Sequence, residues 1–105
     1  NQQKVLVGKA LVRDVKLFIL DEPTVGVDVG ARVAIYRFIK DLCEAGAGVL
    51  LISSDLPEIL NLSHRAYVMH RGNCNAEIER VNLTEENVLK HFFDQEEPRL
   101  IDHVA

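Results

Sequence analysis

The sequence contains only two cysteines and no long apolar run, and each of these shortages excludes a class of protein. Cys43 and Cys74 are isolated, with no second cysteine or histidine at metal-ligand spacing, so neither a zinc site nor a disulfide framework is expected. The apolar runs at residues 17–20 and 48–52 are far shorter than the roughly 20 residues that cross a bilayer. No charged-then-apolar signal opens the chain. We therefore expect a soluble, cytoplasmic chain with two reduced, partly buried thiols.

Basic charge is also scarce, because 12 Lys and Arg residues stand against 16 Asp and Glu residues and the formal net charge is -4. Nucleic-acid surfaces depend on clustered Lys and Arg, and here the basic residues are scattered, so no nucleic-acid partner is predicted. The content of 48% hydrophobic and 27% charged residues is typical of a globular protein. A chain of 105 residues fits one domain with a modest core and marginal stability.

Apolar runs alternate with helical patterns along the first part of the chain. Residues 16–20 predict a buried strand, and residues 29–45 predict a helix with one apolar and one charged side. Residues 49–53 predict a second strand buried on both faces, as the first is, and a short helix follows that Asp55 caps and that ends at Leu62. The order predicts an α/β fold with parallel strands covered by helices. An earlier helical pattern opens the chain at Val5, Leu6, Ala10 and Leu11.

The pattern then changes to short strands. Residues 66–70 and 76–79 flank a predicted turn at residues 71–73, which indicates an antiparallel β-hairpin. Thr84 is a predicted N-cap, and the C-terminal helix that follows it reaches Phe93.

Two adjacent acids, Asp21 and Glu22, stand directly after the apolar run at residues 17–20. Ligands of open parallel sheets bind at the carboxyl ends of the strands, so this pair lies where chemistry would occur. Because successive strand residues point in opposite directions, one carboxylate could face a metal and the other a reacting water. Acids at such a place are also found as helix caps or solvated loop residues, and the pair alone leaves both interpretations open.

The residues around this pair resemble a known family. Residues 17–24, four apolar residues followed by Asp-Glu-Pro-Thr, and residues 26–28, Gly-Val-Asp, resemble the Walker B motif and D-loop of ATP-binding cassette (ABC) proteins. Residues 1–5 resemble the end of the signature motif, so we expect the sequence to begin inside that motif. The resemblance implies that residues 1–93 form the C-terminal part of a P-loop NTPase domain of the ABC type. Residues 94–105, rich in acids, are expected to form a poorly ordered tail.

Shorter segments narrow the resemblance to the second cassette of bacterial monosaccharide importers of the ribose, galactose and xylose type, in which two cassettes are fused. These segments are Asp-Val-Gly-Ala-Arg at residues 28–32, Ile-Ser-Ser-Asp-Leu-Pro-Glu at residues 52–58, and the Asn of the signature remnant. Most ABC proteins have a His at the end of the switch strand, where this chain has Ser54. The second cassettes of sugar importers are similar to this chain at that place.

The resemblance implies roles for individual residues. Asp21 would hold Mg²⁺, and Glu22 would be the catalytic base that polarises a water for attack on the γ-phosphate of ATP. Asp28 would contact the opposing cassette across the bound nucleotide. Asn1 and Gln2 would belong to the signature loop, which contacts ATP bound to the partner. The expected nucleotide-binding residues are therefore Asp21, Asn1, Gln2 and Asp28.

Ser54 would be a second catalytic residue, donating its hydroxyl to a phosphate oxygen. A hydroxyl is shorter than an imidazole and carries no proton that titrates near neutral pH, so we expect slow turnover at this site. The resemblance also implies that the two composite sites are unequal. No Gly-rich Gly-Lys-Ser/Thr sequence, the P-loop that supplies most phosphate contacts, occurs here, so we expect the chain by itself not to hydrolyse ATP.

The implied partners are an opposing cassette, a sugar permease in the membrane and, indirectly, a periplasmic sugar-binding protein. The chain would then be a peripheral protein on the cytoplasmic face of the inner membrane. Strands that the family places beside residues 16–20 are missing, which would leave an apolar edge and face uncovered, so the chain is predicted to self-associate as a dimer or larger oligomer.

Two other functions stay open on the sequence. One is a non-hydrolysing regulatory cassette that binds nucleotide weakly and serves as a dimerisation surface, which Ser54 favours. The other, a receiver-type phosphotransfer domain, is disfavoured because its separate acidic pair near the start of the chain is absent. His70, His91 and His103 are too far apart in sequence to indicate a metal or catalytic site.

Overall fold

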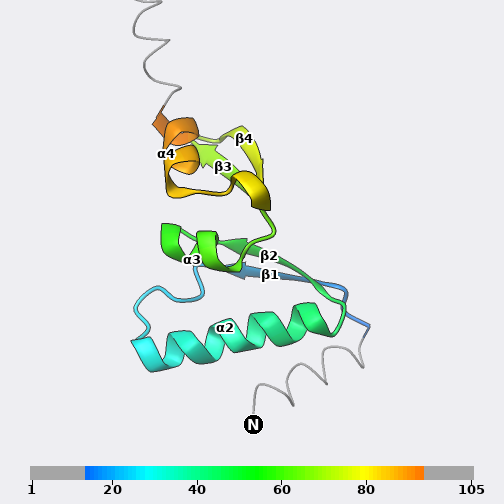
Figure 1. Cartoon of the computed structure of the whole chain (residues 1–105). Coiled ribbons are helices and arrows are strands. Elements are labelled where there is room, and N and C mark those ends of the chain that lie inside the picture. The colour runs from blue at the N-terminus through cyan, green and yellow to red at the C-terminus, as the bar shows by residue number, and fades with distance from the viewer. Residues whose placement is uncertain (1–13, 94–105) are drawn as a thin grey trace, which may run out of the picture. The chain divides into compact units, whose positions relative to one another are not determined.

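The computed structural model describes residues 14–93, in which the chain divides into two compact units on either side of the Ser54–Asp55 bond. Each unit contains its own two-stranded sheet (Figure 1). The first predicted helix, the signature remnant with Asn1 and Gln2, and the predicted tail lie outside the described residues.

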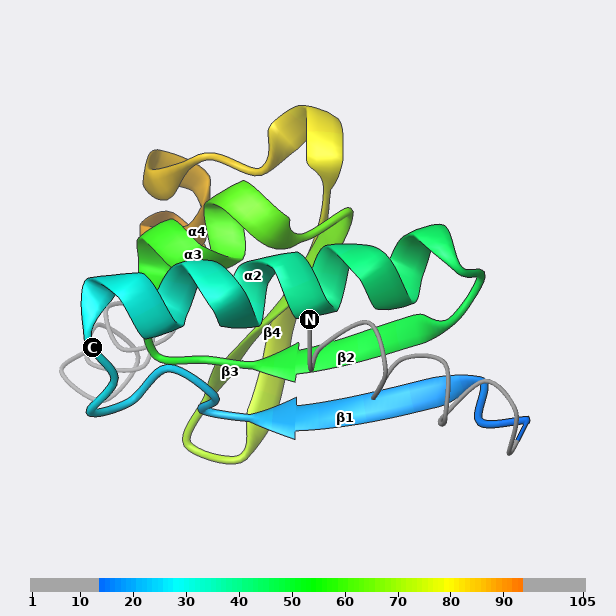
Figure 2. The ribbon, with the colours of Figure 1, turned by 90° about the horizontal axis from the view of Figure 1, so that it is seen from below.

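The first unit is a strand, a helix and a strand: β1 (Leu17–Asp21), α2 (Val29–Glu44) and β2 (Gly48–Ile52). The strands pair in parallel along their full length, ending with Asp21 opposite Ile52. α2 runs lengthwise beside this sheet (Figure 2). The predicted parallel α/β arrangement is confirmed, although β1 lies one residue later and β2 one residue earlier than predicted. Asp21 is therefore the last residue of its strand.

Both ends of α2 are capped. The Asp28 carboxylate accepts a hydrogen bond from Ala31 N at 2.8 Å, as an N-cap side chain does. After the helix, Gly46 has a φ of +97°, a left-handed conformation that glycine adopts without steric cost. Ala47 N then donates to Leu42 O at 3.0 Å, and the two side chains pack together. This hydrogen bond, the positive φ and the apolar contact form the Schellman motif that ends the helix.

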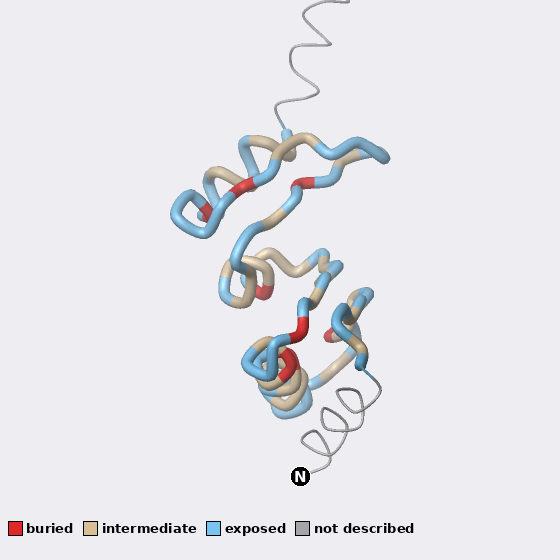
Figure 3. Tube along the Cα trace, turned by 90° about the vertical axis from the view of Figure 1, so that its right-hand side faces the viewer, coloured by how far each residue is buried: buried red, intermediate tan, exposed pale blue. Residues whose placement is uncertain are grey.

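The core of the first unit lies between α2 and one face of its sheet. Leu42 is fully buried, with 0% exposure, and it packs with Ala47. Phe18 of β1, Phe38 of α2 and Val49 of β2 pack against this pair. In the Cα trace of Figure 3, buried positions are few, as expected for a small core.

The opposite face of the same sheet is exposed. Leu17, Ile19, Leu50 and Ile52 form this open sheet face, and their exposed fractions range from 44% for Ile52 to 62% for Ile19. The prediction from the apolar runs, that both strands are buried on both faces, was therefore wrong, whereas the prediction that an apolar face is left uncovered agrees with this open sheet face. The physical reason is that α2 covers one face only, and a parallel sheet needs elements on both faces to be buried on both.

The second unit is a hairpin with helical segments. Its elements are α3 (Leu56–Leu62), β3 (Arg65–His70), β4 (Asn73–Glu79), the short 3-10 helix η1 (Arg80–Asn82) and α4 (Glu85–Phe93). The N-caps are those predicted, because Asp55 Oδ1 accepts from Glu58 N at 3.1 Å and Thr84 Oγ1 accepts from Asn87 N at 3.2 Å.

β3 and β4 pair in antiparallel fashion, as predicted, and His70 stands opposite Asn73 at the closed end. The turn consists of Arg71 and Gly72, which have φ values of +50° and +80°. Positive φ at both central residues is the pattern of a type I′ turn, whose twist matches that of the strands. The predicted three-residue turn was one residue too long, and β4 begins three residues earlier than predicted because this turn allows pairing to start at Asn73.

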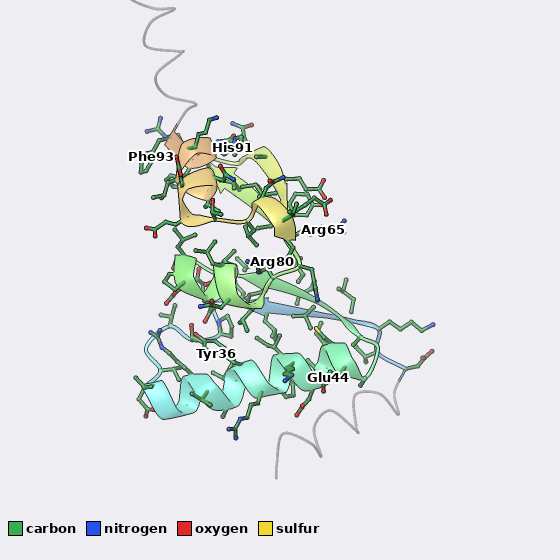
Figure 4. All side chains as sticks on the ribbon, in the orientation of Figure 1. Tyr36, Glu44, Arg65, Arg80, His91 and Phe93 are labelled. Atoms are coloured by element: carbon green, nitrogen blue, oxygen red, sulfur yellow. The ribbon has the colours of Figure 1, made fainter. Side chains whose placement is uncertain are left out.

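The core of the second unit consists of Val68, Ile78 and Leu83, each at most 5% exposed. Arg80, labelled in Figure 4, fastens the neighbouring helix end. Its guanidinium donates to Leu60 O at 2.6 Å and to Ser63 O at 2.9 Å. These carbonyls lie at the C-terminal end of α3, where a helix leaves its carbonyl groups without partners inside the helix. Within residues 14–93, no helix combines the length and the apolar character needed to cross a bilayer.

Candidate functional site

The predicted catalytic residues meet where the two parallel strands of the first unit end. Glu22 N donates to Ile52 O at 2.7 Å, which extends the pairing of β1 and β2 by one residue. Just beyond β2, Ser54 Oγ donates to Glu22 Oε2 at 3.0 Å. Two residues 32 positions apart in sequence are thus in direct contact. The contact stands at the carboxyl edge of the sheet, where parallel sheets bind their ligands.

Glu22 departs from the extended conformation of the strand before it. Its φ is +49°, in the left-handed region that non-glycine residues occupy rarely and that is found most often in turns and functional sites. The alternation of side chains along a strand therefore applies to Asp21 but not to Glu22. This corrects the expectation that alternation alone separates the two carboxylates, because the backbone turns at Glu22 itself.

Backbone hydrogen bonds within the loop after Glu22 stabilise it. Val25 N donates to Glu22 O at 3.4 Å, and Val27 N donates to Thr24 O at 3.2 Å. Thr24 is buried inside this loop, with 3% exposure. Sequence analysis identified Thr24 only as part of the Asp-Glu-Pro-Thr motif and did not predict its burial. The loop therefore leaves β1 as a compact turn that starts at the proposed base.

Asp28 has a structural role that sequence analysis missed. Its carboxylate caps α2, while the Arg32 side chain donates from Nε to Val27 O at 3.2 Å and ties the loop to the first turn of the helix. Asp before a helical pattern is a common N-cap, and this signal was present in the sequence. The Asp28 carboxylate thus bonds to Ala31 N, and the structure brings Glu22 and Ser54 together without it.

Asp21 offers a carboxylate at the carboxyl edge of the sheet. Its carboxylate is exposed at the end of β1, beside Glu22, and carboxylate oxygen is a ligand that Mg²⁺ prefers. Mg²⁺ is usually held by one or two carboxylates together with waters and substrate phosphates, and Asp21 has the chemistry of such a ligand. In residues 14–93 no three His, Cys, Asp or Glu side chains gather as a metal site.

The histidine and cysteine residues of the described range have other surroundings. His70 packs edge-on against Phe92, with ring centroids 4.7 Å apart in the second unit. Both thiols were expected to be partly buried; Cys43 is half-buried, whereas Cys74 is exposed. The candidate site is therefore the cluster of Asp21, Glu22 and Ser54 at the carboxyl edge of β1 and β2.

Comparison with known proteins assigns the chain to a family. No family model matches the chain. The ribose import ATP-binding protein of Caldanaerobacter subterraneus is 55% identical over 89 residues, which are 85% of this chain and 18% of that protein. A ribose import ATP-binding protein of Streptomyces avermitilis is 53% identical over 89 residues, 85% of this chain and 17% of that protein. The chain belongs to the ATP-binding cassette family.

Two further proteins are similar to the chain. The xylose import ATP-binding protein of Yersinia pestis is 47% identical over 90 residues, which are 86% of this chain and 18% of that protein. A solved ATP-binding cassette of an ABC transporter is 29% identical, with a TM-score of 0.63, over 85% of this chain and 37% of that one. The chain spans less than a fifth of the length of the curated relatives that it matches.

Proposed function

We propose that this cassette is part of the ATP-binding and ATP-hydrolysing subunit that powers sugar import across the bacterial inner membrane. The observation that carries the proposal is the contact of Glu22 and Ser54 at the ends of two parallel strands, next to Asp21. The names of the relatives, ribose and xylose import ATP-binding proteins, support the substrate class. We assign the chain to the second cassette of a tandem ATPase because Ser54 stands where most cassettes have a His.

The proposed chemistry uses two carboxylates in different roles. Mg²⁺, when bound with ATP, neutralises charge on the phosphates, and Asp21 is the residue that would hold it. Glu22 would orient a water toward the γ-phosphate and accept its proton. The left-handed backbone of Glu22 and the hydrogen bond from its N–H to Ile52 O fix the position of the Cα atom from which the side chain extends. Residues 1–105 contain no P-loop, so we propose that they do not hydrolyse ATP by themselves.

The proposed partners follow from the same assignment. Asp28, together with Asn1 and Gln2, would face the opposing cassette and its ATP. A sugar permease in the membrane would be the second partner, and a periplasmic sugar-binding protein would act through that permease. The subunit would then lie peripherally on the cytoplasmic face of the inner membrane.

A second function is favoured by one observation. Ser54 has a hydroxyl in place of a titratable imidazole, and that hydroxyl is donated to the proposed base. A cassette of this kind could bind nucleotide and support dimerisation without efficient hydrolysis. The two functions differ in whether Glu22 is needed for turnover.

The deciding experiment is Glu22→Gln in the full-length ATPase, with ATP turnover and ATP affinity measured in parallel. Gln keeps the size of the side chain but cannot accept a proton from water. Loss of turnover by at least about a hundredfold with unchanged affinity supports the catalytic role, since general-base catalysis contributes about that much or more. Unchanged turnover would show that this cassette is the non-hydrolysing one.

A further inference from the structure

We propose that Ser54 is a positioning residue for Glu22 and does not itself serve the phosphate. The inference rests on the proposed function, because it concerns how the proposed base is oriented. It replaces the sequence-based expectation that the Ser54 hydroxyl donates to a phosphate oxygen.

The first argument is the number of protons available. A serine hydroxyl has a single O–H to donate, and in the structure that donor serves Glu22 Oε2 at 3.0 Å. Donation to a phosphate oxygen would require the hydroxyl to leave the carboxylate. An imidazole has two ring nitrogens and is able to serve two partners at once. A serine at this place must choose one partner, and the geometry points to Glu22.

The second argument is that the end of β2 holds Glu22 at two points. Ile52 O, at the last residue of β2, accepts from Glu22 N at 2.7 Å, and Ser54, two residues later, holds the carboxylate. A glutamate side chain has several rotatable bonds, and holding them in one conformation costs entropy that a fixed partner for the carboxylate offsets. With the backbone and the carboxylate both anchored to β2, the direction of the side chain is set.

The consequence is a division of labour between the two carboxylate oxygens. Oε2 accepts the Ser54 hydroxyl, and Oε1 is then the oxygen that would accept the proton of the attacking water. In this step the water O–H bond breaks and its proton moves to Oε1, while the water oxygen forms a bond to the γ-phosphorus. The bond between that phosphorus and the bridging oxygen breaks, and ADP leaves with its electron pair. Because Ser54 acts through Glu22, its removal should slow hydrolysis without weakening ATP binding.

The test uses single-turnover ATP hydrolysis by the full-length ATPase, with the base of the other cassette replaced so that this site alone contributes. Ser54→Thr and Ser54→Val form a matched pair, because they have the same shape and differ in the hydroxyl. We expect Thr to retain most of the rate and Val to lose roughly ten- to hundredfold, the scale on which misplacing a catalytic group acts. The affinity for ATP should be the same in both variants.

A double-variant comparison separates this role from a direct phosphate contact. When each is combined with Glu22→Ala, the Ser54→Thr and Ser54→Val variants should have the same residual rate. An equal loss in both backgrounds, or a weaker ATP affinity in the Val variant alone, would overturn the inference. Thermal unfolding midpoints of the Thr and Val proteins should agree, and a difference in rate without a difference in midpoint cannot come from misfolding.

The two proposals fail in different ways. If Glu22→Ala leaves turnover unchanged, the proposed hydrolytic function of this cassette is wrong. If Glu22→Ala abolishes turnover while the Thr and Val variants hydrolyse ATP equally fast, the function stands and the positioning role of Ser54 is wrong.

Discussion

Replacing Asp28 tests whether this residue serves the helix, the opposing cassette or both. Its carboxylate accepts from Ala31 N at 2.8 Å, and no other acid stands in the first turn of α2. Loss of an N-cap costs about 1 kcal/mol, and loss of a negative charge at a helix N-terminus costs about 0.5 kcal/mol more. We therefore expect Asp28→Ala to destabilise the fold by about 1.5 kcal/mol, or about 8 °C in the unfolding midpoint of a domain of this size.

Asp28→Asn is the matched control, because Asn is as good an N-cap as Asp and lacks only the charge. It should lose about 0.5 kcal/mol, the part that comes from the helix dipole. Urea unfolding followed by the helical circular dichroism signal measures both variants. If Asn destabilises the chain as much as Ala does, the capping argument is refuted. In the full-length ATPase, an Asn variant of normal stability but reduced turnover would show that the carboxylate also serves the opposing cassette.

Two further variants test the packing of the first unit. Leu42→Ala, at the fully buried position, should cost about 2–5 kcal/mol in unfolding free energy, whereas the same change at Leu17, which is 59% exposed, should cost well under half as much. Equal losses would contradict the description of a one-sided core. The open sheet face should support self-association of the chain through a second copy, so Ile19→Lys should lower the light-scattering mass at high concentration. Val29→Lys, at an exposed position of α2, should leave that mass unchanged, and a wild-type chain that is strictly monomeric would disprove the prediction.

Local signals in the sequence were sufficient for much of the fold. The helix caps at Asp55 and Thr84 were predictable because an N-cap bonds to a residue three positions away. The parallel pairing of β1 and β2 followed from two apolar runs separated by a helix. Strand bounds were less predictable, because the type I′ turn at Arg71 and Gly72 shifts the start of β4 and turns depend on backbone conformation that a short motif does not specify.

The apolar runs alone predicted the wrong burial of the strands, although the family resemblance predicted one uncovered apolar face. A continuous apolar run is typical of a strand covered on both faces, and β1 and β2 have such runs. In the first unit α2 covers one face, and Ile19 on the other is 62% exposed. The apolar pattern describes what a strand can bury, whereas the elements that pack on it decide what it does bury.

For the acid pair at the site, too, the sequence predicted some features and the tertiary structure decided others. The sequence by itself determined the family resemblance, the order of elements and the place of Asp21 and Glu22 after a parallel strand, because these depend on residues that are neighbours in the chain. Only the tertiary structure decided that Ser54 contacts Glu22 at 3.0 Å and that Glu22 has a left-handed backbone. That contact joins residues 32 positions apart, and it exists because parallel pairing brings the carboxyl ends of β1 and β2 to the same edge.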